Sequence, residues 1–112
     1  MIESYSFGRM AVDGRIFTAD LIILPDRILT NWWRKAGHLL SLTDLDEALK
    51  EEPDALVIGT GALGMLRIED EVQRYLKERK IEFLPGKTKK AIDLFNEWAP
   101  RKRTVGAFHL TC

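Results

Sequence analysis

The chain has 112 residues, of which 46% are hydrophobic and 30% are charged, with 17 basic residues against 17 acidic ones. This length suits one domain with one core, and we take residues 1–112 as that domain. The balanced charge argues against a nucleic-acid-binding protein, which needs a basic face. No apolar run approaches the roughly 20 residues that a membrane span requires. The high charged fraction is compatible with a thermophilic source.

The start of the chain and its cysteine content favour a cytoplasmic protein. Met1-Ile2-Glu3-Ser4 lacks a basic region followed by an apolar stretch, so we expect no secretory signal. The single cysteine, Cys112, excludes an internal disulfide and a cysteine-based zinc site. His38 has no second ligand type at a metal-binding spacing. We therefore expect no metal and no cofactor.

The first third of the chain is predicted to form antiparallel strands. Asp13-Gly14 separates Met10–Val12 from Arg15–Phe17, which is a strong signal for a hairpin with a two-residue turn. Residues 20–24 form a candidate buried strand, and Pro25-Asp26 turns the chain into residues 27–30.

The pair Trp32-Trp33 follows this region. Adjacent residues on a strand point to opposite faces, so one tryptophan is expected in the core and the other at the surface or at an interface. The pair is therefore a candidate surface for self-association or for a protein partner.

From residue 43 the sequence pattern changes to that of alternating helices and strands. Thr43 with Asp46 is typical of a helix start, and Pro53-Asp54 ends that helix. The predicted elements that follow are a strand at 55–58, a helix near 69–79, a strand at 81–84, a helix near 88–98 and a strand at 104–110. The predicted fold class is α/β with α+β character at the N-terminus. Antiparallel hairpins come first and α-β-α-β-α-β follows, in a three-layer domain with a central mixed sheet.

Two short segments are expected to meet at one edge of this sheet. Gly59-Thr60-Gly61 ends one predicted strand, and Gly86-Lys87-Thr88 follows the next. The carboxyl ends of parallel strands share an edge, where α/β proteins form ligand sites. Gly59, Gly61 and Gly64 match the dinucleotide spacing, but no helix opens at once and no acid ends the next strand. The segment at 86–88 lacks the earlier glycine of a phosphate-binding loop. A small-anion site and a plain structural turn both remain open.

The charge distribution bears on this choice. Residues 87–112 carry six basic and two acidic side chains, a net charge of +4, which leaves −4 for residues 1–86. Lys87, Lys89 and Lys90 crowd the start of a predicted helix, where positive charge opposes the helix dipole. This arrangement indicates either an anionic ligand or partner at that end, or three solvated side chains.

His109 completes the candidate site, because a parallel last strand would bring it to the same edge. A pairing of His109 with Cys112 could support nucleophilic chemistry. A structural histidine is the competing interpretation. We assign no catalytic residue.

Three stretches together resemble the Mth-type domain family. They are Asp54–Gly61 (DALVIGTG), Ala91 with Phe95-Asn96, and Ala107–Cys112 (AFHLTC). That family includes the adipogenesis-associated Mth domain-containing proteins and a mitochondrial complex I assembly factor. The resemblance spans nearly the whole chain and is strongest from 54 to 112. It implies a compact three-layer α/β domain with a central mixed sheet and no established catalytic activity, and it marks the 59–61 turn as the implied pocket.

These observations favour an accessory or assembly-type cytoplasmic protein that binds a small anion or ligand at the carboxyl edge of its sheet. The expected site residues are Gly59, Thr60, Gly61, Gly86, Lys87, Thr88 and His109. The expected interface residues are Trp32 and Trp33, in contact with a protein partner or a second copy. The alternative is a small enzyme acting on an anionic metabolite, with Lys87 or His109 as the acid–base group.

Overall fold

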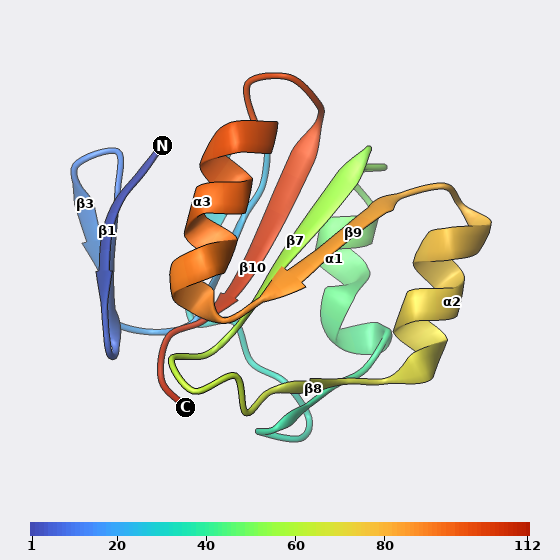
Figure 1. Cartoon of the computed structure of the whole chain (residues 1–112), viewed down its shortest axis with the longest axis horizontal. Helices are drawn as coiled ribbons and strands as arrows, with labels where there is room; N and C mark the ends of the chain where they lie inside the picture. Colours follow the sequence, from blue (N-terminus) through green and yellow to red (C-terminus); the bar gives the residue numbers. More distant parts are fainter.

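The computed structural model describes residues 1–112 and is built around a five-stranded mixed sheet (Figure 1). The strand order is β5-β4-β10-β7-β9. In chain order the strands are β4 (Leu21–Ile23), β5 (Ile28–Leu29), β7 (Ala55–Thr60), β9 (Glu82–Gly86) and β10 (Thr104–His109). Strands β10, β7 and β9 run parallel, whereas β4 and β5 are antiparallel additions at one side. The predicted α/β fold with a mixed central sheet is confirmed.

A separate three-stranded antiparallel sheet forms the N-terminal layer. It consists of β1 (Ile2–Ser6), β2 (Arg9–Val12) and β3 (Arg15–Phe17). The hairpin predicted at Asp13-Gly14 is present, and both turn residues have positive φ, at 48° and 79°. The carboxylate of Glu3 accepts hydrogen bonds from the amides of both turn residues, at 3.1 and 3.0 Å. Local turn chemistry and a neighbouring strand therefore specify the same hairpin.

Three helices connect and cover the sheets. They are α1 (Asp46–Leu49), which continues a 3₁₀ turn at Thr43–Leu45, α2 (Asp70–Glu78) and α3 (Thr88–Trp98). The predicted cap on α1 was wrong in its register, because Thr43 makes no capping bond. Instead, the Asp44 carboxylate accepts the Ser41 amide at 2.9 Å. The same Ser/Thr-x-x-acid pattern occurs two residues earlier, and the side chain that reaches back is Asp44. None of the helices combines the length and the apolar character that a membrane span requires.

The parallel strands separate two hydrophobic clusters by strict alternation. Val57 of β7 points to the face that carries α3 and the N-terminal sheet, whereas Leu56 and Ile58 point to the face that carries α1 and α2. All three side chains are fully buried. A short apolar run without polar alternation is therefore a central strand covered on both faces, as expected.

Strand β9 lies at one edge of the sheet and contains Pro85. Glu82 donates its amide to Asp54 on the β7 side. In a parallel ladder the backbone N–H and C=O groups of alternate residues point to the same neighbour. Those of Leu84 and Gly86 therefore point toward β7, whereas the backbone groups of Phe83 and Pro85 point to the open side of the strand. The missing N–H of proline thus falls on the open side of the strand, where it disrupts no ladder bond and discourages pairing with another chain.

The sequence prediction missed one element. Strands β6 (Leu39–Leu40) and β8 (Arg67–Ile68) form a two-stranded parallel pair. Two residues are too few to produce a periodic signal, and their partners are far apart in the chain. The segment at Trp32-Trp33 was expected to be extended, but it lies in no strand.

The connections place the candidate site at a reversal of the chain path. The path moves outward from β7 to β9 through α2, and then back past β7 to β10 through α3. Right-handed crossovers in opposite directions place the two helices on opposite faces of the sheet (Figure 1). The loops that leave β7 and β9 diverge at this point, which is where open α/β sheets place ligands.

Candidate functional site at the carboxyl edge of the sheet

The ends of β7, β9 and β10 meet at one edge of the sheet, and hydrogen bonds tie them together. The Thr60 hydroxyl donates to the Gly86 carbonyl at 3.0 Å. The hydroxyl of Thr88, a fully buried residue, accepts the Gly61 amide at 2.9 Å and donates to the His109 carbonyl at 2.6 Å. Thr88 also gives its own amide to the Gly61 carbonyl at 3.1 Å. One threonine therefore connects all three strand ends.

Glycine is required at positions 59 and 61 because neighbouring atoms leave no space for a side chain. A methyl group on Gly59 would lie 2.9 Å from a ring carbon of Phe108 and 3.0 Å from the Thr88 hydroxyl. Gly61 has a φ of 103°, a backbone conformation that residues other than glycine rarely adopt. The two glycines allow β7 to end directly against the start of α3.

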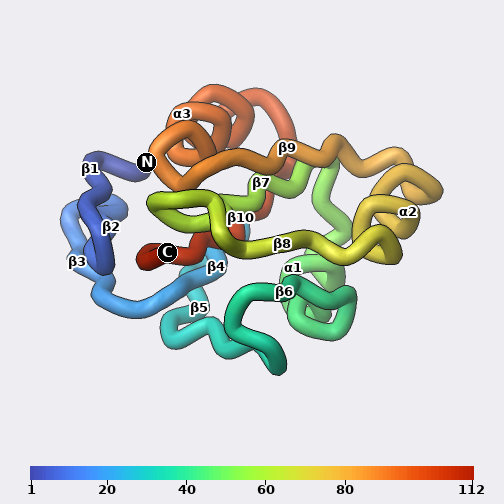
Figure 2. The backbone as a smooth tube through the Cα atoms, turned by 60° about the horizontal axis from the view of Figure 1, so that its bottom comes forward, coloured from blue at the N-terminus to red at the C-terminus, as the bar shows by residue number.

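The last residues of the chain cover the turn after β7. The Thr111 carbonyl accepts the Ala62 amide at 2.7 Å, and the Cys112 carbonyl accepts the Met65 amide at 2.9 Å. A methyl group on Gly61 would lie 2.4 Å from the backbone of Cys112. The chain end and the loop after β7 lie side by side in both backbone views (Figures 1 and 2). The amides of Gly61, Ala62 and Met65 are thus already paired within the protein.

The start of α3 is the part of this edge that stays open to solvent. Lys87, Lys89 and Lys90 are all exposed. The helix has no side-chain cap, and no acidic residue lies in its first turn. The first amides of a helix have no intrahelical acceptor, and they carry the positive end of the dipole. The Lys87 side chain runs across Gly64, where a methyl group would lie 3.3 Å from Cγ of the lysine.

His109 lies at the same end of the sheet but belongs to a buried charged network. Its Nδ1 is 2.7 Å from Asp20 Oδ2, and Arg34 reaches the same carboxylate oxygen at 2.9 Å. The side chains of His109 and Arg34 are only 8% and 6% exposed. Asp20 Oδ1 accepts the Leu110 amide at 2.7 Å. Desolvation and, to a lesser extent, the Asp20 charge raise the pKa of the nearby Tyr5 hydroxyl.

The short contact with Asp20 decides which ring nitrogen of a neutral His109 carries the proton. A carboxylate only accepts, so a neutral His109 carries its proton on Nδ1 and donates it to Asp20. Arg34 Nη2, 3.1 Å from the same nitrogen, finds its acceptor in the Gly37 carbonyl at 3.3 Å. His109 Nε2 and Arg34 Nε are buried and have no hydrogen-bond partner within the protein. An oriented histidine with one unpaired nitrogen is the arrangement of a general base.

Asp20 and Arg34 were not anticipated from the sequence. Asp20 stands directly before an apolar strand and Arg34 directly after two tryptophans, and neither position has a spacing that links it to His109. The partner of Asp20 lies 89 residues away. These side chains come together only in the folded protein, where β4 lies beside β10.

The two predicted interface residues have different environments. Trp32 is half-buried, donates its indole N–H to the Asp44 carbonyl at 3.0 Å, and carries the Arg34 guanidinium 4.7 Å from its ring centre. Trp33 is 76% exposed. A large exposed aromatic surface is a feature of interaction sites.

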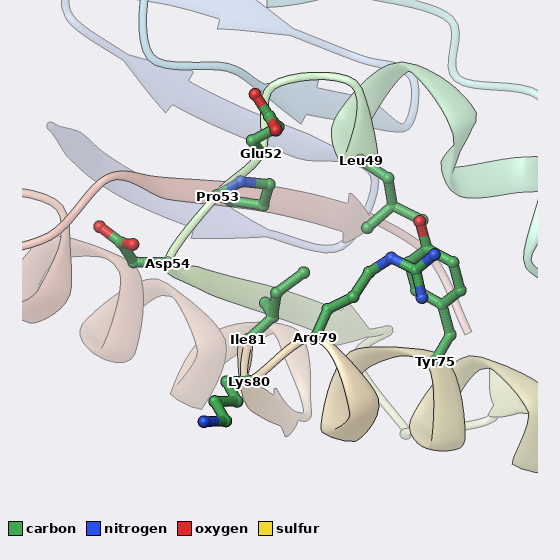
Figure 3. Close-up of a pocket in the computed structure, with 8 residues that line it drawn as sticks. All are labelled: Leu49, Glu52, Pro53, Asp54, Tyr75, Arg79, Lys80 and Ile81. Atoms are coloured by element: carbon green, nitrogen blue, oxygen red, sulfur yellow. The ribbon is translucent and has the colours of Figure 1, made fainter.

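A cavity of about 450 Å³ opens near the other end of the sheet, where β7 and β9 begin (Figure 3). It is lined by Leu49, Glu52, Pro53, Asp54, Tyr75, Arg79, Lys80 and Ile81. The Arg79 guanidinium lies 3.8 Å from the centre of the Tyr75 ring. Figure 3 shows the Glu52, Asp54 and Lys80 side chains pointing in different directions. No predicted site residue lines this cavity, and its charged groups do not converge.

Comparison with known proteins identifies the family. A family model described as "Protein of unknown function (DUF498/DUF598)" matches residues 2–110. The chain belongs to this family. Conserved hypothetical protein PH1505 from Pyrococcus horikoshii OT3 is similar at 31% identity and a TM-score of 0.85, over 100% of this chain and 99% of that one. The protein MT938 is similar at 25% identity and a TM-score of 0.82, over 100% and 98% of the two chains.

A third solved structure shares the fold. It is described as an outer membrane protein from Bartonella henselae, and it superimposes with a TM-score of 0.82 at 23% identity, over 99% of this chain and 94% of that one. These matches show that solved structures share this fold, and the family description itself names no activity.

Proposed function

We propose that this chain is a non-catalytic binding protein of accessory or assembly type, which works in the cytoplasm and holds an anionic group at the carboxyl edge of its sheet. The observation that carries the proposal is the start of α3. Three exposed lysines surround a helix start with no cap and no acid. Such a helix end is stabilised by an anion, because amides and dipole both favour negative charge there.

The proposed contacts fall into two groups. Lys87, Lys89 and Lys90 supply charge. The first-turn amides of α3 that follow Thr88 supply directed donors, since the Thr88 amide is already accepted by the Gly61 carbonyl. Gly59, Thr60, Gly61, Gly86 and Thr88 hold the edge in shape through the bonds described above. His109 fixes the end of β10 from within the core. The ligand is a carboxylate or a phosphate, either as a small molecule or on a partner protein.

Exposed apolar side chains support a partner-borne anion. Leu63 and Met65 lie in the loop that the Lys87 side chain crosses, and they are 65% and 52% exposed. An acidic group on an apolar protein segment would meet both kinds of surface at once.

The alternative is a small enzyme acting on an anionic metabolite. The Asp20–His109 pair favours His109 over Lys87 as its acid–base group, because Lys87 is exposed to solvent and is not held by any acid. The burial of His109 weighs against this alternative, since a substrate would have to reach Nε2 through packed side chains.

Three finer assignments are part of the same proposal. We propose that the chain is an Mth-type domain, supported by the Asp54–Gly61 and Ala107–Cys112 stretches. We propose a thermophilic source, supported by the charged fraction of 30%. The exposed Trp33 supports a protein partner or a homodimer.

A thermal-shift screen against phosphates, nucleotides, coenzymes and organic acids tests the anion site. A ligand at about 100 times its Kd stabilises the folded state by about 2.7 kcal/mol. We expect an anion to raise Tm in the wild type and to lose this effect in Lys87→Glu. Lys102→Glu is the matched control, because Lys102 is an exposed lysine beyond the other end of α3.

The outcomes separate the alternatives. An equal shift in wild type and Lys87→Glu would contradict the anion site. Consumption of the anion by the wild type, lost in His109→Gln but retained in Lys87→Glu, would favour the enzyme. A screen without any anion hit would leave the accessory role dependent on protein partners alone.

A further inference from the structure

A second surface, built from different residues, lies between β5 and α1. A cavity of about 460 Å³ opens there. In Figure 2, β5 and α1 lie on the side of the molecule away from α3. One wall comes from residues 29–35 and the other from residues 43–47. The bond from the Trp32 indole to the Asp44 carbonyl joins the two walls. Strand β5 ends the sheet on this side, so one of its edges is unpaired.

Apolar side chains line part of this groove. Ile22, Leu29 and Trp32 line its interior, and Trp33 stands at its rim with 76% of its surface exposed. The ring of Trp32 is already occupied by the Arg34 guanidinium. No side chain of the protein covers the Trp33 ring in this way. A free indole face in a groove is a favourable position for a cation.

The charge of the groove has one dominant sign. Three carboxylates line it, from Asp44, Asp46 and Glu47, against the single ammonium group of Lys35. Asp44 is committed to the Ser41 and Lys35 amides. Glu47 makes only an exposed pair with Lys50 at 3.3 Å, and the Asp46 carboxylate makes no hydrogen bond or ion pair. The groove thus offers one carboxylate without a partner in the chain, that of Asp46, in surroundings with an excess of acidic groups.

We propose that this groove docks a segment of a partner protein that carries a lysine or arginine next to an apolar side chain. The cation lies over the Trp33 ring and pairs with Asp46. The apolar neighbour enters the space lined by Leu29 and Trp32. The Arg34–Trp32 contact shows the same chemistry within the chain, 4.7 Å from guanidinium carbon to ring centre.

Charge complementarity selects this occupant over a second copy of the chain. A two-fold symmetric dimer through the groove would place the same acidic rim on both sides of the interface. Like charges facing each other across an interface cost free energy and suppress the wrong partner. A basic segment meets no such penalty.

Selection from a displayed library of short random peptides tests the proposal without assuming a sequence. Peptides that bind wild-type protein are selected and then depleted on Trp33→Ala. We expect the survivors to be enriched in lysine or arginine beside an apolar residue. The best peptide should bind about tenfold more weakly to Trp33→Ala. It should also weaken with added salt and with the double change Asp46→Asn and Glu47→Gln.

Matched controls separate the groove from general stickiness. Phe7→Ala removes an exposed aromatic side chain in the turn between β1 and β2, and Glu78→Gln with Glu97→Gln removes two exposed acids elsewhere. Both controls should bind the peptide as the wild type does. Survivors without basic residues, or no survivors at all, would overturn the proposal. Concentration-dependent self-association that disappears in Trp33→Ala would replace it with a dimer interface. None of these results depends on Lys87.

Discussion

Several single residues in the candidate site make contacts within the protein that leave little of them available to a ligand. Gly59 and Gly61 resemble a phosphate-binding turn in sequence, yet the amide of Gly61 is bound by Thr88 and the space beside it is filled by the chain end. The Thr88 hydroxyl both accepts and donates a hydrogen bond within the protein. The spacing of glycines reports where backbone segments approach, and a ligand is only one reason for such an approach.

Gly61→Ala should be strongly destabilising. Its φ of 103° strains any side chain, and the added methyl group would meet Cys112 at 2.4 Å. We expect the free energy of unfolding to fall by about 2–4 kcal/mol, measured by urea denaturation. Gly14→Ala is the control with positive φ but no atom within 4 Å, and it should cost about 1 kcal/mol. Equal costs for the two variants would show that the chain end does not pack against Gly61 in solution.

At the scale of elements, helix starts differ in a way that the sequence only partly reveals. Neither α2 nor α3 has a side-chain cap, but α2 begins with Asp70 and Glu71, which suit its dipole, whereas α3 begins among lysines. The short α1 is held by Asp44, which reaches back to the Ser41 amide and hydroxyl, both at 2.9 Å. Each helix start uses residue types that sequence rules recognise. The position of the cap on α1, however, depends on which acidic side chain reaches a free backbone amide, and in this structure it is Asp44.

Asp44→Ala and Asp46→Ala should therefore differ in stability. Asp44 accepts three hydrogen bonds from Lys35 and Ser41, and its loss leaves those donors unpaired. We expect Asp44→Ala to lower the free energy of unfolding by about 1–2 kcal/mol, from thermal denaturation followed by circular dichroism. Asp46→Ala, with an exposed and unpaired carboxylate, should leave the unfolding transition almost unchanged. The reverse order would support the cap at Thr43 and Asp46.

At the scale of the whole molecule, one buried network joins parts that are distant in sequence. Asp20 connects the entry to β4 with Arg34 in the loop after β5 and with His109 and Leu110 at the end of β10. The Tyr5 hydroxyl from the N-terminal sheet donates to the Leu110 carbonyl at 2.7 Å. The network fastens the N-terminal layer to the central sheet.

Asp20→Asn should weaken the whole fold, because Arg34 would keep a buried charge without its carboxylate. Breaking such a pair typically costs about 3–5 kcal/mol, and the loss should appear as a single lowered transition in urea denaturation. Asp26→Asn is the control, since it breaks an exposed pair with Arg27 and should leave the midpoint nearly unchanged. Similar small effects in both variants would mean that water reaches the Asp20 network.

The sequence by itself determined the elements whose signals are local. The Asp13-Gly14 hairpin, the buried strand after Ala55 and the helix from Thr88 to Trp98 follow from turn chemistry, apolar runs and periodicity. The parallel direction of β7 and β9 then brings Gly59 and Gly86 to one edge of the sheet. Only the tertiary structure decided that the chain end fills the turn after β7, that Asp20 and Arg34 surround His109, and that Trp33 faces an acidic groove. These features depend on contacts between residues far apart in the chain, and no short-range pattern encodes which distant side chain will pack against which.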